Sequence, residues 1–321
     1  MKDYGAEFIR NVVLLGHGGA GKTTLAEAML FLTGGTDRFG SVLDGNTVMD
    51  FDPEEIRRKF SISTSVAPIE WGGCKINLLD TPGYFDFIGE QKQGIAVADG
   101  ALILAGGKDG LQVGTEKAWA ACVERKIPHV LLISKIDEEN SDFKKVFTQL
   151  KDTFGKSVIA LEVPIFEDAK AVGVVNVATM KAAIHKGKET VEVDIPDKMI
   201  PLIAEYRDGI TEAVAETDEA LMEKYFAGEA FTEEEIVKGL HDGITAGEIS
   251  PVLCVSAVTT DGVKMLMDSI VKYFPSHTEK GTVEAKTPDG KALALKAQDS
   301  ETFSAIVFKT VVDAFVGKIS F

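Results

Sequence analysis

Short apolar runs recur along the chain, and each is followed by a segment with helical spacing. The apolar runs are residues 9–15, 75–79, 101–105, 129–134 and 251–256. The helical patterns between and after them are residues 24–32, 85–98, 114–125, 142–154 and 263–273. Continuous apolar runs of this length are typical of strands buried on both faces. Because these strands alternate with helices, the pattern predicts an α/β protein with a doubly wound, mostly parallel sheet.

The alternation is interrupted over residues 158–248. This stretch opens with strand-like segments and then becomes helical and acidic. The strand-like segments are 158–165, 173–178 and 190–193, and the helical ones are 197–216, 218–225 and 232–245. The acids that follow Thr232 are typical of the first turn of a helix. We therefore predict an inserted α+β subdomain between a first core part (residues 1–157) and the last core strand and helix (residues 249–276).

The C-terminal part differs from both. Residues 277–300 are polar and contain the turn-forming sequence Pro288-Asp289-Gly290, so we expect a linker or exposed loop there. Two strands are expected over residues 302–310 and 315–321. Since a lone hairpin is marginal in water, we expect residues 301–321 to open a further, truncated domain.

The composition narrows the class of protein. The 321 residues, 45% of them hydrophobic, suffice for one large α/β domain with an insertion or for two domains. No apolar run approaches the roughly 18 residues of a membrane helix, and the start lacks the apolar core of a signal peptide. Three scattered cysteines (Cys74, Cys122 and Cys254) suit a reducing cytosol and argue against zinc or disulfides. We expect a cytoplasmic protein without a membrane partner.

The formal net charge is −16. An excess of acids disfavours broad binding to nucleic-acid phosphates, which needs a basic surface. We expect no sequence-specific binding to nucleic acid, while contact through a small local surface stays compatible with the composition. The simplest consequence of the charge is solubility.

A glycine-rich motif joins the first predicted strand to the first predicted helix. It matches the Walker A pattern, in which backbone N–H groups and a helix N-terminus surround phosphates. Lys22 would reach the β- and γ-phosphates, and the hydroxyl of Thr23 would bind Mg²⁺. The candidate nucleotide-binding residues here are Gly16, His17, Gly18, Gly19, Ala20, Gly21, Lys22, Thr23 and Thr24.

A second motif, Asp80-Thr81-Pro82-Gly83, follows the apolar run at 75–79. An aspartate at the end of such a strand is placed to bind Mg²⁺ through water. Gly83 can present its backbone N–H to a γ-phosphate because no side chain blocks the approach. The tetrapeptide alone would also suit a plain turn, and its position after a Walker A motif favours the site.

Two further strand ends provide candidate base-binding residues. In Ser134-Lys135-Ile136-Asp137, the aspartate can accept two hydrogen bonds from guanine that adenine cannot donate. The stem of Lys135 can lie flat over the base. Ser256-Ala257, at the end of the run 251–256, can offer a backbone N–H to guanine O6. Together these motifs predict GTP or GDP with Mg²⁺ as ligands.

The motif set resembles that of translational GTPases, and among them elongation factor G and its paralogues. The matching segments are residues 16–24, 80–87, 134–137 and 256–257. Residues 213–225 resemble the extra subdomain of elongation factor G, and residues 307–319 resemble the opening of that family's second domain, a β-barrel. The resemblance covers nearly the whole chain and implies that this chain is a piece of a longer protein.

The resemblance also implies a loop at residues 51–65 that closes over the γ-phosphate. Ser61 falls where the family usually has a magnesium-binding threonine, and a slip of one or two places in the alignment would favour Ser63 or Thr64 instead. The implied magnesium site thus consists of Thr23, Ser61 and Asp80.

Three residues depart from the family pattern. Tyr84 stands where the family has the histidine that positions the attacking water, and a phenol does not carry the same charge near neutral pH. Ser134 replaces an asparagine that ties the base loop to the phosphate loop, a loss we expect to cost about 1–3 kcal/mol. Gly19 replaces an aspartate. These changes indicate a divergent paralogue, whose candidate catalytic residues are Lys22, Gly83 and Tyr84.

The leading hypothesis is a monomeric, elongation-factor-G-like protein that hydrolyses GTP on the ribosome. Its intrinsic hydrolysis should be slow, since the motifs contain no arginine finger. A GTP-binding switch with little hydrolysis is the alternative that Tyr84 suggests. A ribosomal protection protein is another, and an adenine-specific P-loop enzyme is disfavoured by Asp137.

Overall fold

The central element is a seven-stranded sheet with the order β2-β3-β1-β4-β5-β11-β6. The computed structural model describes residues 2–168, 170–186, 189–298, 300–301, 303–313 and 315–321. Only β2 runs antiparallel to its neighbour, and the other pairings in this sheet are parallel. The predicted α/β fold with a mostly parallel sheet is therefore confirmed. The strands are β1 (Ile9–Gly16), β2 (Ser65–Trp71), β3 (Cys74–Asp80), β4 (Gly100–Gly106), β5 (His129–Ser134), β6 (Val158–Ala160) and β11 (Ser250–Val255).

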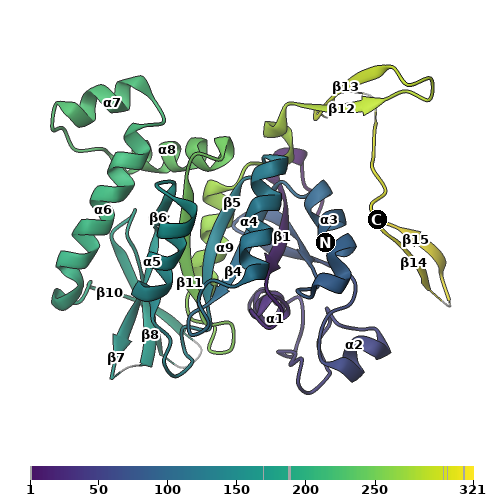
Figure 1. Cartoon of the computed structure of the whole chain (residues 1–321), viewed down its shortest axis with the longest axis horizontal. Coiled ribbons are helices and arrows are strands. Elements are labelled where there is room, and N and C mark those ends of the chain that lie inside the picture. Colours follow the sequence, from purple (N-terminus) through teal and green to yellow (C-terminus); the bar gives the residue numbers. More distant parts are fainter. Residues whose placement is uncertain (1, 169, 187–188, 299, 302, 314) are drawn as a thin grey trace.

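Helices lie on both faces of this sheet (Figure 1). One face carries α1 and α9, which also contact each other, and the other carries α3, α4 and α5. The central strands are buried on both faces, as the unbroken apolar runs predicted: residues 12–15, 101–105 and 130–133 belong to the core. The helices are α1 (Lys22–Leu32), α3 (Ile88–Val97), α4 (Val113–Arg125), α5 (Phe143–Phe154) and α9 (Val263–Tyr273).

Short helical turns occur in the loops. The helix expected over residues 85–98 starts as a 3₁₀ turn, and only its second part is α-helical. The loop after α1 contains α2, which begins with a capping box formed by Asp52 and Glu55. The short helices are η1 (Ala6–Phe8), α2 (Pro53–Arg58), η2 (Phe85–Phe87), η3 (Asp197–Met199) and η4 (His277–Lys280).

The inserted subdomain consists of a four-stranded antiparallel sheet, order β10-β9-β8-β7, followed by three helices. The strands are β7 (Glu162–Glu167), β8 (Lys170–Asn176), β9 (Lys181–Lys186) and β10 (Glu189–Val193), and the helices are α6 (Ile200–Ala215), α7 (Glu219–Phe226) and α8 (Glu233–Ala246). The strand expected over residues 158–165 is in fact two strands in different sheets. Residues 158–160 pair with β11, so the insertion begins after them and not at residue 158.

The C-terminal part also differs from expectation. The expected linker at residues 277–300 contains η4 and an antiparallel hairpin of β12 (Thr282–Lys286) and β13 (Ala292–Lys296). The strand expected over 302–310 is wrong: residues 303–309 are irregular, residue 302 lies outside the described residues, and β14 (Thr310–Asp313) pairs with β15 (Gly317–Ser320). Figure 1 shows this second hairpin beside the α2 and α3 side of the molecule.

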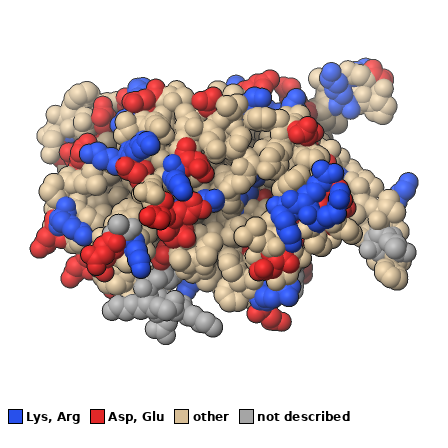
Figure 2. Space-filling view, turned by 60° about the horizontal axis from the view of Figure 1, so that its bottom comes forward, with Lys and Arg blue, Asp and Glu red and all other residues tan. Residues whose placement is uncertain are grey.

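Two properties of the chain concern its possible contacts with nucleic acid and with membranes. Acidic and basic side chains are interspersed on the face shown in Figure 2, and the basic ones form no belt across it. No helix in the described part of the chain has the length and apolarity that crossing a bilayer requires.

Candidate nucleotide-binding site

The loop between β1 and α1 has the geometry of a phosphate-binding loop. Gly19 and Gly21 have φ angles of +82° and +91°, which a side chain would disfavour. Gly21 is the N-cap of α1, so the first backbone N–H groups of this helix are available to an anion. The loop lies where parallel strands end, beside Asp80, whose Cα pairs with that of Leu14.

Lys22 is the cation of this loop. Its side chain is buried, 6% exposed, and its Nζ donates to the carbonyl oxygens of Gly16 (3.2 Å) and His17 (3.0 Å). Burial lowers the pKa of Lys22 to about 8, while the charges of Asp80 and Asp50 oppose this shift. A phosphate oxygen would supply the negative charge that the two carbonyls lack.

A cluster of hydroxyl and carboxyl groups lies next to Lys22. The Thr23 hydroxyl donates to one carboxyl oxygen of Asp80 (2.7 Å), and it lies 3.0 Å from the Ser61 hydroxyl. The other Asp80 oxygen is buried without a partner among the described residues, and burial raises the pKa of this carboxyl. Oxygen ligands of this kind fit Mg²⁺. The structure thus brings together the three residues predicted to bind the metal.

In the described part of the chain, no hydrogen bond joins the alternatives to Ser61 to this cluster. The Thr64 hydroxyl donates to the carbonyl oxygen of Glu90 (3.0 Å), and neither Thr64 nor Ser63 lines the cavity. The geometry therefore favours Ser61 as the residue next to the metal position.

Asp50 belongs to the same cluster, and the sequence analysis missed it. It is 4% exposed, and one of its carboxyl oxygens has no partner among the described residues. Burial raises its pKa to about 6, opposed by a hydrogen bond from Ser61. Glu27 fixes this loop by accepting from the N–H groups of Val48 (2.7 Å) and Met49 (2.9 Å). The only sequence signal was an aspartate between two apolar residues, just before the expected loop 51–65.

Gly83 and Tyr84 close the phosphate side. A Cβ at residue 83 would lie 2.6 Å from the Lys22 Nζ and 2.7 Å from the backbone of Gly18, so only glycine fits there. The Tyr84 ring lies beside Gly18 and packs against Phe60, with 4.7 Å between ring centroids. Tyr84 is 45% exposed. A cavity of about 210 Å³ remains between these residues, the phosphate loop and Lys135.

Ser134 corrects one of our expectations. We expected the serine to lose the tie between the base loop and the phosphate loop, but its hydroxyl donates to the carbonyl oxygen of Ala20 over 2.7 Å. A second contact reaches the carbonyl oxygen of Ala105 (3.3 Å). The shorter side chain therefore still joins the two loops, because β5 places its end directly beside them.

The remaining base-site residues lie beyond this cavity. Lys135 lines its end, with its Nζ 3.0 Å from a Glu138 oxygen, while Asp137 is exposed. The N–H of Ser256 already donates to the carbonyl oxygen of Asp261 (2.9 Å), which leaves Ala257 as the candidate donor to a base. Of the phosphate-loop residues, His17 turns its ring toward Gly114 and does not line the cavity.

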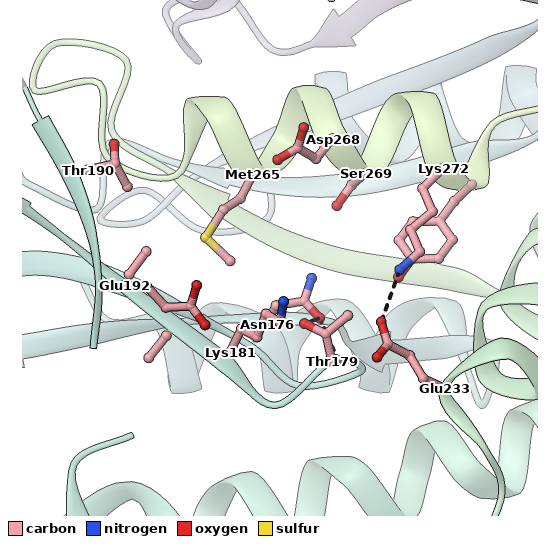
Figure 3. A pocket seen from close by; sticks show the side chains of 13 residues that line it. Asn176, Thr179, Lys181, Thr190, Glu192, Glu233, Met265, Asp268, Ser269 and Lys272 are labelled. Atoms are coloured by element: carbon pink, nitrogen blue, oxygen red, sulfur yellow. Dashed lines mark hydrogen bonds and ion pairs between the residues drawn. The ribbon is translucent and has the colours of Figure 1, made fainter. Parts of the chain in front are cut away.

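A second cavity, about 400 Å³, lies between β8–β10 and α9. Figure 3 shows Asp268 and Ser269 on the α9 side, facing Lys181 and Glu192 of the inserted sheet. An ion pair between Lys272 and Glu233 (3.6 Å) closes one end. No residue of the predicted motifs lines this cavity, so the predicted nucleotide site is the smaller one.

Comparisons with known proteins agree with this geometry. Residues 7–276 match the family described as "Elongation factor Tu GTP binding domain". A solved structure of a protein from Thermus thermophilus is similar, with a TM-score of 0.86 and 35% sequence identity. The match covers 98% of this chain and 45% of that one, so this chain spans less than half the length of its relative. The chain therefore belongs to the translational GTPase family, through its elongation factor Tu GTP-binding domain.

Proposed function

We propose that this chain binds GTP and GDP with Mg²⁺ and hydrolyses GTP, as part of an elongation-factor-G-like protein that acts on the ribosome. One observation carries the proposal: buried Lys22 lies beside the Thr23–Asp80–Ser61 cluster at the edge where the parallel strands end. In open α/β sheets this edge is the usual place for a ligand.

Each residue of the cluster has a role at the phosphates. Lys22 and the N–H groups at the start of α1 would hold phosphate oxygens. The hydroxyls of Thr23 and Ser61 would bind Mg²⁺ directly, and Asp80 would hold it through water. Asp50 would accept from a second water. The metal, when bound, neutralises charge on the transferred phosphoryl group.

Guanine selectivity rests on Asp137, with the Ala257 N–H as donor to O6 and the Lys135 stem over the ring. A bound base would cover the Asp137 carboxylate, which is exposed in the structure. Adenine would then give this carboxylate neither donor, and a covered acceptor left unpaired gives strong discrimination.

Tyr84 favours a second candidate, a switch with little hydrolysis. Its hydroxyl can hydrogen-bond water, but a phenol is a poor substitute for an imidazole as acid or base. Single-turnover GTP hydrolysis with and without ribosomes separates the two. Acceleration by ribosomes supports the hydrolysing factor, and no hydrolysis in either case supports the switch.

Calorimetry with GTP, GDP and ATP in the presence of Mg²⁺ tests the binding proposal, on this chain and on Asp137→Asn. We expect tight binding of guanine nucleotides, weak binding of ATP, and loss of this preference in the variant. Glu139→Gln, an exposed acid of the same loop, is the matched control and should keep the preference. Equal binding of ATP by the unaltered chain would overturn the proposal.

A further inference from the structure

The backbone between Ser61 and β2 is held by carboxylates from two helices. Glu55 of α2 accepts from the N–H groups of Ile62 (2.8 Å) and Ser63 (3.1 Å). Glu90 of α3 accepts from the N–H of Thr64 (2.6 Å). Three successive amides are thus fixed by side chains, so the position of Ser61 depends on where these two helices lie.

Lys309, from the segment just before β14, completes this arrangement. Its Nζ donates a short hydrogen bond to the carbonyl oxygen of Thr64 and lies 3.9 Å from a carboxyl oxygen of Glu90. The side chain is 13% exposed. Burial lowers the pKa of Lys309, and the negative charges of Glu90 and Glu55 oppose that shift. The ammonium group is therefore surrounded by a carbonyl oxygen and two carboxylates. Lys309 is far from Thr64 in the sequence but contacts it directly in the fold.

The two partners of Lys309 come from the two segments that meet at the phosphate end of the site. Thr64 is three residues after Ser61, and Glu90 lies in the first turn of α3, the helix that follows Asp80 and Gly83. One side chain thus contacts both segments. The neighbouring Phe308 packs against the hydrophobic core, whereas Val312 of the hairpin is 72% exposed, so Lys309 lies where the C-terminal segment attaches to the nucleotide domain.

We propose that Lys309 is a positioning residue that couples the nucleotide in the site to the C-terminal residues 303–313 and 315–321, an inference that rests on the proposed function. When Ser61 engages the metal beside a γ-phosphate, residues 61–65 are fixed and the carbonyl of Thr64 forms the binding position for Lys309. When that contact is lost, residues 61–65 loosen and Lys309 loses its acceptor. By linkage, the docked lysine must favour the triphosphate state to the same extent.

The first test compares Lys309→Met with the unaltered chain in binding GDP and a non-hydrolysable GTP analogue, both with Mg²⁺. Methionine keeps the length of the stem and removes the charge. We expect roughly tenfold weaker binding of the analogue, the size of one charge-assisted hydrogen bond, and unchanged binding of GDP. Lys309→Arg should recover most of the loss. Lys318→Met, an exposed lysine on the same hairpin, is the matched control and should change neither affinity.

The second test measures the same coupling at the C-terminal residues instead of at the nucleotide. Amide hydrogen exchange of residues 303–313 and 315–321 should be slower with the GTP analogue than with GDP, and Lys309→Met should remove this difference. Glu90→Gln combined with Lys309→Met should cost less than the sum of the single changes, because both act through Thr64.

The possible results are distinguishable. An equal loss for both nucleotides in Lys309→Met would show a structural role only and overturn the inference, as would unchanged binding of the analogue. If the unaltered chain binds ATP as well as GTP, the proposed function itself fails.

Discussion

Two of the cavities in the described part of the chain differ in a way that volume does not predict. The one between the inserted sheet and α9 is about 400 Å³, nearly twice the 210 Å³ of the one at the phosphate loop. In the larger cavity, Lys272 pairs with Glu233, and Asp268 accepts from the indole N–H of Trp71 (2.7 Å). In the smaller one, Asp50 and Asp80 keep buried oxygens without a partner among the described residues.

The comparison teaches that buried acids next to a buried lysine, and not the volume of the cavity, distinguish the nucleotide site. A buried acid beside the larger cavity, Glu162, accepts from the Ser269 hydroxyl (3.2 Å), while its other carboxyl oxygen is likewise without a partner among the described residues. Burial raises the pKa of Glu162 to about 8. It can stay neutral as a protonated acid. The acids of the smaller cavity instead lie beside buried Lys22, an arrangement that a metal ion and phosphates would complete.

The sharpest test of this difference between the two cavities replaces one lysine in each of them by methionine. Lys22→Met should weaken GDP and GTP binding by roughly 100-fold or more, because it removes a cation that bonds directly to phosphates. Lys272→Met should leave both affinities unchanged. Fluorescence titration with a labelled guanine nucleotide measures both variants, and thermal unfolding shows whether each is folded. A comparable loss in Lys272→Met would mean that the larger cavity takes part in nucleotide binding.

A smaller effect is expected for Glu162, and it concerns the pH dependence of folding stability. Its pKa in the folded chain, about 8, lies above the unfolded value near 4.3, so the folded state binds more protons between these limits. The stability of the fold should therefore fall as pH rises through this window. Between pH 6 and 8 the loss from this group should be about 2 kcal/mol.

Urea unfolding of the unaltered chain and of Glu162→Gln at pH 6 and pH 8 measures that loss. The glutamine variant stays uncharged and can still accept from the Ser269 hydroxyl, so its stability should fall less over the same interval. Nucleotide affinity should be the same in both chains. Parallel pH dependence in the two chains would show that Glu162 is already ionised, and the contrast between the two regions would then lose its electrostatic basis.

Local patterns determined what sequence reasoning found. The strands β1, β3, β4, β5 and β11 are short segments rich in apolar residues, and the phosphate loop is a contiguous motif whose spacing implies its shape. Asp50 was missed because its burial depends on Glu27, which lies more than twenty positions earlier in the chain. The division between β6 and β7 was missed because the apolar run continues through Leu161. β6 joins its sheet through β11, far later in the chain, whereas β7 pairs with the next strand, β8.

Ser134 is a further case in which a contact between distant residues was not predicted from the sequence. Its substitution gives the smallest of the effects that we expect on nucleotide binding. The sequence indicated a missing amide, but a tie between two loops depends on the distance between them, and here a hydroxyl spans it to Ala20. Ser134→Ala should weaken GDP binding by about fivefold, the size of one neutral hydrogen bond that no longer holds the phosphate loop. Ser134→Asn should not improve on the serine, since the tie already exists.

The matched change in the other region is Ser269→Ala, which removes the side-chain donor to Glu162 and leaves the phosphate loop untouched. It should alter stability and not GDP affinity, whereas Ser134→Ala should alter affinity. If Ser134→Asn bound GDP more tightly than the unaltered chain, the serine tie would be weaker than its 2.7 Å length indicates, and the divergence at this position would carry a cost to nucleotide binding after all.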